Sequence, residues 1–183
     1  MSRENEDLLA KRLWRHRGQD RPAFAIEPRE GQESVWDYPR PPILVPDPRP
    51  IEVRAGQLMI ASTRHAVRML ETASPPTFYL PREDVRMELL RPGTGESACE
   101  WKGRTSYFDV LGGDEVIEYA AWSYEQPLAA FTEITGHISF YPGRVDCYVD
   151  GERVRPQSGG FYGGWITNEI VGPFKGDTGT GGW

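Results

Sequence analysis

The sequence contains only two cysteines, Cys99 and Cys147, and neither belongs to a C-x-x-C pair. A disulfide framework and a four-thiolate zinc site within one chain are therefore excluded. The first thirty residues are highly charged, so we expect no secretory signal. No stretch approaches the roughly twenty apolar residues of a membrane span. We therefore expect a reduced, cytoplasmic protein that has no membrane partner.

An excess of basic residues is also missing, because the formal net charge is -6 at pH 7. A protein that binds nucleic acid without sequence preference would need a clustered basic surface to bind the phosphates. We therefore expect no nucleic-acid partner.

Glycine and proline are abundant, with 20 and 16 residues respectively. Both shorten helices and favour turns, which indicates a β-rich domain with irregular extensions. We predict a mainly β fold: a small barrel or roll of short antiparallel strands, with one or two short helices. The expected division is a short helix (about 4–17) and proline-rich arm in residues 1–50, a core domain in 51–155, and a glycine/aromatic tail in 156–183.

Alternating apolar residues and turn signals place the elements of the core. Residues 51–54 and 57–62 read as a hairpin, whereas 66–72 fit either a strand or a short helix. Proline at residue 81 and the acids after it suit a first helical turn over 81–85, and 128–134 reads as a short helical stretch. The remaining predicted strands are 77–80, 104–111, 116–124, 137–141 and 145–149.

Aromatic residues in both extensions favour burial over free chain. Trp36 and Tyr38 indicate an arm that lies against the domain, since free linkers rarely need aromatics. In the tail, glycines alternate with aromatics such as Phe161, Tyr162 and Trp165. Such a tail wraps its own domain or a neighbouring subunit.

Lys102 is the leading candidate for a functional residue, because it stands between Trp101 and Gly103 just before an alternating strand. It can meet an anionic or carbonyl ligand beside an aromatic stacking face. Partial burial would lower its pKa toward use as a base or Schiff-base amine. The structural alternative is a solvated lysine in a turn, or one that pairs with Glu71 or Asp84.

Aromatic residues two apart on a strand share one face, which places Trp122 and Tyr124 together. Tyr107 joins them from the neighbouring predicted strand, and Tyr79 is similar. Such residues line a ligand pocket or fill a core. Glu71 ends a semi-apolar segment, where a carboxylate needs a partner, and we expect that partner to be Lys102.

No histidine stands near Cys99 in the sequence, so a buried, inert thiol is expected there, and Cys147 reads as core. The three histidines, His16, His65 and His137, form no ligand pattern. We therefore predict no metal site.

Five ordered blocks between about residues 53 and 148 carry a family resemblance. They are 56–62 with Leu70 and Glu71, 79–85, 99–103 with Tyr107, 121–124 with Pro127, and 136–141. These blocks resemble the bacterial "domain of unknown function 427" family, sometimes labelled nucleotidyltransferase-like. The resemblance implies a compact, mostly β fold and no established reaction.

The chain departs from that family in one place, because Glu100 follows Cys99 where the family commonly has proline. The nucleotidyltransferase label finds little support. The chain has no Gly-Ser turn ahead of paired metal-binding carboxylates, and no glycine-rich phosphate loop. We therefore predict no cofactor.

Three functional hypotheses follow. The first is a small anionic or polar ligand bound in an aromatic-walled pocket of Trp101, Tyr107, Trp122, Tyr124 and Tyr79, with Lys102 and Glu71 as polar anchors. The second is an enzyme in which Lys102, with a carboxylate such as Glu71, gives acid–base or electrostatic catalysis. The third is an interaction module whose arm and tail dock a partner or form a homodimer.

Overall fold

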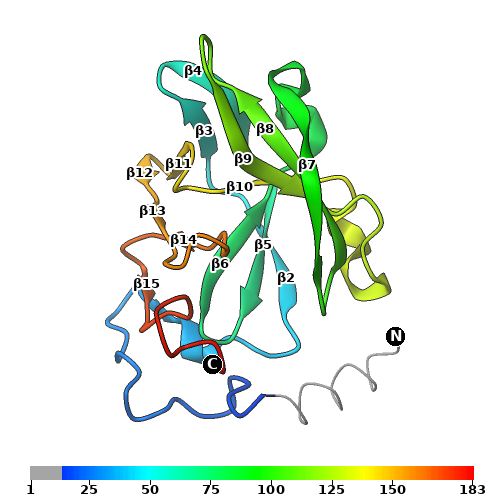
Figure 1. The fold of residues 1–183 in the computed structure, drawn as a ribbon. Coiled ribbons are helices and arrows are strands. Elements are labelled where there is room, and N and C mark those ends of the chain that lie inside the picture. The colour runs from blue at the N-terminus through cyan, green and yellow to red at the C-terminus, as the bar shows by residue number, and fades with distance from the viewer. Residues whose placement is uncertain (1–13) are drawn as a thin grey trace.

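The computed structural model describes residues 14–183, which form mainly short β-strands arranged in several sheets (Figure 1). The mainly β fold is therefore confirmed. Most of the helix predicted over about 4–17 lies outside the described residues, and residues 14–17 are not helical.

One sheet contains the predicted hairpin. Its strand order is β12 (Glu152–Arg153), β11 (Asp146–Val149), β3 (Ile51–Ala55), β4 (Leu58–Thr63), all antiparallel. Gly56 makes the turn between β3 and β4 at a φ of 58°, a left-handed conformation that glycine adopts without strain.

A second sheet orders β2 (Ile43–Asp47), β5 (Ala66–Glu71) and β6 (Ser74–Tyr79). The ambiguous segment 66–72 is thus a strand. β2 lies within the predicted proline-rich arm, for which no strand was predicted. It tolerates Pro46 because it is an edge strand that pairs only with β5.

The third sheet orders β10 (Ile138–Phe140), β9 (Val116–Ser123), β8 (Gly103–Leu111) and β7 (Leu90–Cys99). The sequence did not predict β7, because Pro92, Gly93 and Gly95 read as turn residues. The β7–β8 register shifts between Pro92 and Glu96, so these residues occupy an irregularity in the ladder.

All four helices among residues 14–183 are short 3₁₀-helices: Val35–Asp37, Arg82–Asp84, Met87–Leu89 and Ala129–Ile134. Two of them confirm the helical turns predicted over 81–85 and 128–134. None has the length and hydrophobicity required to cross a lipid bilayer.

None of the described sheets closes into a barrel. Closure needs every strand to pair on both sides, and the edge strands β2 and β7 carry Pro46 and Pro92, which have no backbone N–H to donate. The barrel is therefore not confirmed, and the strands form separate open sheets.

The arm and the tail pack against each other and against the sheets. β1 (Glu33–Ser34) pairs in parallel with β15 (Ile170–Val171), and β13 (Arg155–Pro156) pairs with β14 (Trp165–Ile166). The buried Trp36 indole donates to the Pro173 carbonyl at 3.1 Å and contacts the Trp183 ring. The expectation of an arm lying against the domain is confirmed, and the tail wraps its own domain; both run along the lower part of Figure 1.

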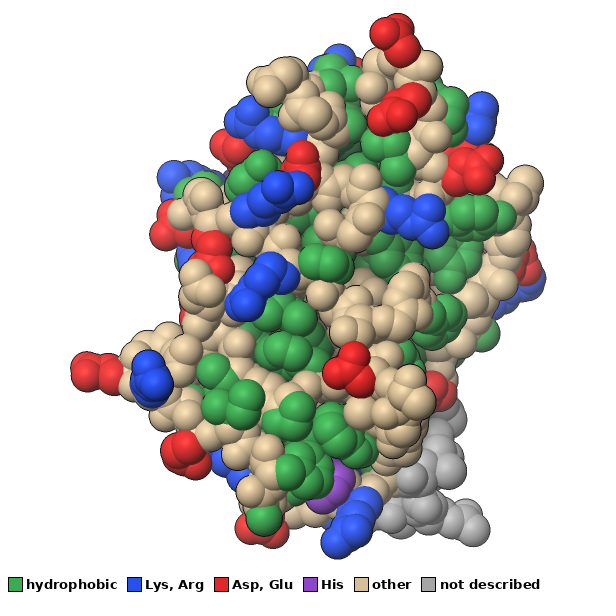
Figure 2. Space-filling view, turned by 60° about the vertical axis from the view of Figure 1, so that its left-hand side comes forward, with side chains coloured by type: hydrophobic (Ala, Val, Ile, Leu, Met, Phe, Trp, Pro, Cys, Tyr) green, Lys and Arg blue, Asp and Glu red, His purple; other side chains and the backbone are tan. Residues whose placement is uncertain are grey.

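The main core lies where the sheets meet and is apolar throughout. Ile51, Val53, Phe78, Val110 and Phe140 belong to it, and Trp165 from the tail stacks on Phe78 at 4.9 Å between ring centroids. Cys147 is buried in this core, as predicted. On the face shown in Figure 2, positive and negative side chains are interspersed around patches of hydrophobic surface.

Candidate functional site

A pocket of about 180 Å³ lies between the β5–β6 strands of one sheet and the β7–β8–β9 strands of another. Each strand contributes residues two positions apart, which share one face of a strand. β5 and β6 provide Met69, Glu71, Thr77 and Tyr79. β7, β8 and the end of β9 provide Ser97, Cys99, Thr105, Tyr107, Trp122 and Tyr124.

The structure brings every sequence-predicted site residue to this one pocket. The residues are Glu71, Tyr79, Trp101, Lys102, Tyr107, Trp122 and Tyr124. Their aromatic rings contact one another, with 6.5 Å between the centroids of Tyr79 and Trp122 and 6.2 Å between those of Tyr79 and Tyr124. The aromatic residues that the sequence pattern predicted therefore line one wall of the same pocket. Their role in ligand binding stays a prediction.

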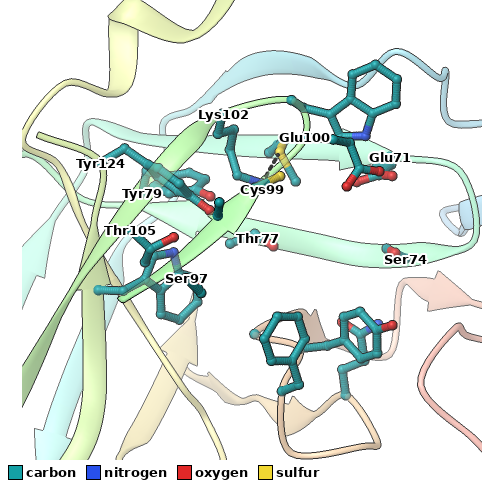
Figure 3. A pocket seen from close by; sticks show the side chains of 18 of the residues that line it. Glu71, Ser74, Thr77, Tyr79, Ser97, Cys99, Glu100, Lys102, Thr105 and Tyr124 are labelled. Atoms are coloured by element: carbon teal, nitrogen blue, oxygen red, sulfur yellow. Dashed lines mark hydrogen bonds between the residues drawn. The ribbon is translucent and has the colours of Figure 1, made fainter. Parts of the chain in front are cut away.

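Lys102 is 6% exposed, so its interpretation as a solvated turn lysine is wrong. Its Nζ donates to the Met69 Sδ at 3.2 Å, and it lies 5.4 Å from the centroid of the Tyr124 ring. Figure 3 shows Lys102 beside Tyr79, Tyr124 and Cys99. A thioether is a weak acceptor, and among residues 14–183 no carboxylate lies within ion-pair distance of this ammonium.

Two opposing effects act on the pKa of Lys102. Burial lowers it, while the attraction of Tyr79, Tyr124, Cys99 and Glu71 raises it, and the net result lies well above the ordinary value of a lysine. This direction favours the protonated, ammonium form of Lys102. Use as a free amine, whether as a base or as a Schiff-base nucleophile, does not fit this charge state.

Two polar groups of the pocket, the Tyr79 hydroxyl and the Trp101 indole N–H, make no hydrogen bond of good geometry among the described residues. Trp122 and Lys102 lie close enough to the Tyr79 hydroxyl to oppose the rise in its pKa. Tyr79 is 1% exposed, and burial raises its pKa, so its hydroxyl is neutral at neutral pH. A buried donor without a partner loses about 1–3 kcal/mol of desolvation free energy. Such groups gain a partner when a ligand with acceptor atoms fills the pocket.

Glu71 lines the pocket but does not pair with Lys102 as expected. Its carboxylate accepts from Arg40 Nε at 3.1 Å, and the Arg40 side chain is fully buried. Arg40 also donates to the Thr72 carbonyl at 2.7 Å. A buried guanidinium requires several acceptors, and Glu71 is the carboxylate that reaches it. The other proposed partner, Asp84, accepts instead from Thr63 at 2.6 Å.

Lys175 also lines the pocket, and the sequence reasoning missed it. It is 9% exposed and lies 4.4 Å from the centroid of the Trp14 ring. Burial lowers its pKa, with Arg40 lowering it further and Glu71 and Glu100 opposing the shift. The rarity of lysine could have drawn attention to it, because the chain has only three lysines among its 21 basic residues. Two of the three line this pocket.

The tail covers one side of the pocket through Phe161, Tyr162 and Gly163. A Cβ atom placed on Gly163 would overlap the ring of Trp122, so the tail backbone lies directly against that ring. Only glycine permits so close an approach of the backbone to the ring. The tail is also held by the Tyr141 hydroxyl, which donates to the Phe161 carbonyl at 3.5 Å.

The remaining candidates add no second centre. Cys99 is half-buried and faces the pocket, whereas the sequence had suggested a buried thiol. None of the three histidines lines the pocket. Within the described part of the chain, His, Cys, Asp and Glu side chains form no group of three or more that could hold a metal ion.

A family model described as a domain of unknown function (DUF427) matches residues 43–151, which include the strands on both sides of the pocket. No curated protein matches the chain.

Proposed function

We propose that this chain, which belongs to the domain of unknown function (DUF427) family, binds a small organic anion in the aromatic-walled pocket. The carrying observation is the Lys102 ammonium, which is buried and has only a thioether as acceptor. A buried charge without a counter-charge is costly, and an anionic ligand supplies that counter-charge.

The chemistry of the walls supports a ligand with both charge and apolar surface. Donors from Tyr79 and Trp101 are unpaired, and the rings of Trp122 and Tyr124 line the pocket as apolar surface. The pocket volume of about 180 Å³ leaves room for a small organic molecule. This size suits a single-ring carboxylate or phosphate.

The charge state of Lys102 separates binding from two forms of catalysis. A pKa above the ordinary value keeps Lys102 protonated, which favours anion binding over proton abstraction or Schiff-base formation. An enzyme that used Lys102 only to stabilise developing negative charge would need the same ammonium. Anion binding is therefore the property that both hypotheses share.

The test uses benzoate and phenyl phosphate as probes and benzamide as their neutral counterpart. We expect the two anions to raise the melting temperature of the intact protein, because a ligand that binds only the folded state stabilises it. Benzamide should have a much smaller effect. Isothermal titration calorimetry then gives the dissociation constants.

Lys102→Met removes the charge and retains the length of the side chain, so anion binding should weaken at least tenfold. Arg64→Met is the matched control, since Arg64 is exposed and lies outside the pocket. It should bind both anions as the unmodified chain does. Equal affinity in the Lys102→Met protein, shown by circular dichroism to be folded, would contradict the proposal.

A further inference from the structure

A second groove adjoins the pocket at its tyrosine wall. Four residues line both cavities: Ser97, Tyr107, Tyr141 and Phe161. Beyond them the groove is lined by Tyr119 and Arg144, neither of which lines the first pocket. The two cavities are therefore neighbours, with Lys102 in the inner one, Arg144 at the exposed outer one, and tyrosines between them.

Arg144 is available to a ligand at the outer end of this path. It is exposed and makes no ion pair with any residue in the described range 14–183. The turn that holds it is fixed by a hydrogen bond from the Arg144 N–H to the Tyr141 carbonyl at 2.9 Å. The carboxylate that lines the same groove, Glu96, is already paired with Arg104. The groove thus presents one unpaired guanidinium.

The backbone of Tyr119 is strained in the conformation that places this residue in the groove. Its φ is 51°, a left-handed value that is uncommon outside glycine. A hydrogen bond from the Tyr119 N–H to Asp109 Oδ1 at 3.0 Å stabilises this conformation. Asp109 is in turn paired with Arg91 at 2.8 Å. Strained residues of this kind cluster at ligand sites.

The Tyr119 ring continues the tyrosine wall. It packs edge-on against Tyr107 with 5.8 Å between ring centroids, and its hydroxyl is hydrogen-bonded to Thr94 at 2.9 Å. Tyr107 is in turn hydrogen-bonded to Ser97 at 2.7 Å. These bonds fix the two rings, so the surface between the two cavities is formed by positioned aromatic side chains.

We propose that the ligand is an elongated dianion, with one anionic group at Lys102, an apolar middle segment along Tyr107 and Tyr141, and a second anionic group at Arg144. This inference rests on the proposed function of the pocket. A guanidinium binds carboxylate or phosphate through two parallel hydrogen bonds, so it favours a ligand that presents such a group at its outer end.

The experiment compares straight-chain dicarboxylates, from succinate to dodecanedioate, with the monocarboxylates of the same lengths. Binding to the full chain is measured by isothermal titration calorimetry. We expect dicarboxylates of the length that spans both cavities to bind about tenfold more tightly than the matched monocarboxylates, whereas shorter ones gain nothing.

Arg144→Gln should reduce the affinity of the spanning dicarboxylates to that of the monocarboxylates and leave the monocarboxylates unchanged. Arg64→Gln is the control, because Arg64 is an exposed arginine outside both cavities. It should alter neither series.

The outcomes separate this inference from the proposed function. If monocarboxylates bind through Lys102 and no dicarboxylate binds better, the dianion is refuted and anion binding stands. A dicarboxylate advantage that persists in Arg144→Gln also refutes it. If neither series binds while benzoate does, the dianion is refuted and anion binding stands; if benzoate also fails to bind, both proposals are wrong.

Discussion

The two faces of the same strands have opposite characters. On β6, Phe78 faces the main core and Tyr79, the next residue, faces the pocket. On β9, Ala121 lies in the core and Trp122 in the pocket wall. Both faces bury large side chains, but only the pocket face combines them with an open volume, a buried ammonium and an unpaired hydroxyl.

The difference shows which features folding alone accounts for. Apolar packing explains most of the core face, since its side chains gain free energy by leaving water; the buried Ser123 hydroxyl is an exception on that side of β9. Apolar packing does not explain the pocket face, where polar groups stay buried without partners. Sequences that fold stably place such groups where a site requires them. The pocket face is therefore where we place the proposed binding site.

The largest expected contrast is between the neighbours Phe78 and Tyr79. Phe78→Ala leaves a cavity beneath the stacked Trp165, so the free energy of unfolding should fall by about 3–5 kcal/mol. Tyr79→Phe removes only an unpaired hydroxyl, so it should raise the free energy of unfolding by about 1 kcal/mol. Urea denaturation of both variants measures these changes.

The same pair distinguishes stability from binding. Tyr79→Phe should weaken benzoate binding despite its greater stability, because the ligand loses a hydrogen-bond donor. A clear loss of stability in Tyr79→Phe would show that the hydroxyl is already satisfied in the folded protein, and the contrast between the two faces would then fail.

A smaller effect is expected where the tail contacts the pocket wall. Gly163→Ala places a methyl group against the ring of Trp122, and this overpacking should cost about 1–3 kcal/mol. Gly181→Ala is the matched control in the same tail, since a Cβ there has no atom within 4 Å, and it should change stability by less than about 0.5 kcal/mol. Thermal unfolding compares the two. Equal stabilities would mean that the tail does not pack on Trp122 in solution.

Local patterns predicted the part of the site that is built from strands. Alternation put Trp122 and Tyr124 on one face, and the turn at 100–102 identified Lys102. Two features depend on contacts across the chain and were not predictable: Arg40 reaches Glu71 from the arm, and Lys175 reaches the pocket from the tail. The burial of Lys102, likewise, follows from sheet packing that no local pattern encodes.

The smallest expected effect concerns the two lysines of the pocket, whose pKa values shift in opposite directions. Burial lowers the pKa of Lys175, whereas the pKa of Lys102 lies above its ordinary value. As the pH rises toward the usual lysine pKa of about 10.4, Lys175 therefore loses its charge first. Benzoate keeps its charge over this range, so its affinity should fall about threefold in the alkaline range while Lys102 stays protonated, a free-energy change of about 0.7 kcal/mol.

Lys175→Arg keeps its charge at every pH used, so its benzoate affinity should not decline. Lys175→Met should bind more weakly at neutral pH and show an equally flat profile. The measurements are made in a Cys99→Ser background, which removes the half-buried thiol that lines the pocket. If the decline persists in Lys175→Arg, another group causes it and Lys175 does not contribute to anion binding. If it disappears, the pocket face contains two cations with separate roles: Lys102 as the permanent counter-charge, and Lys175 as the one that responds to pH.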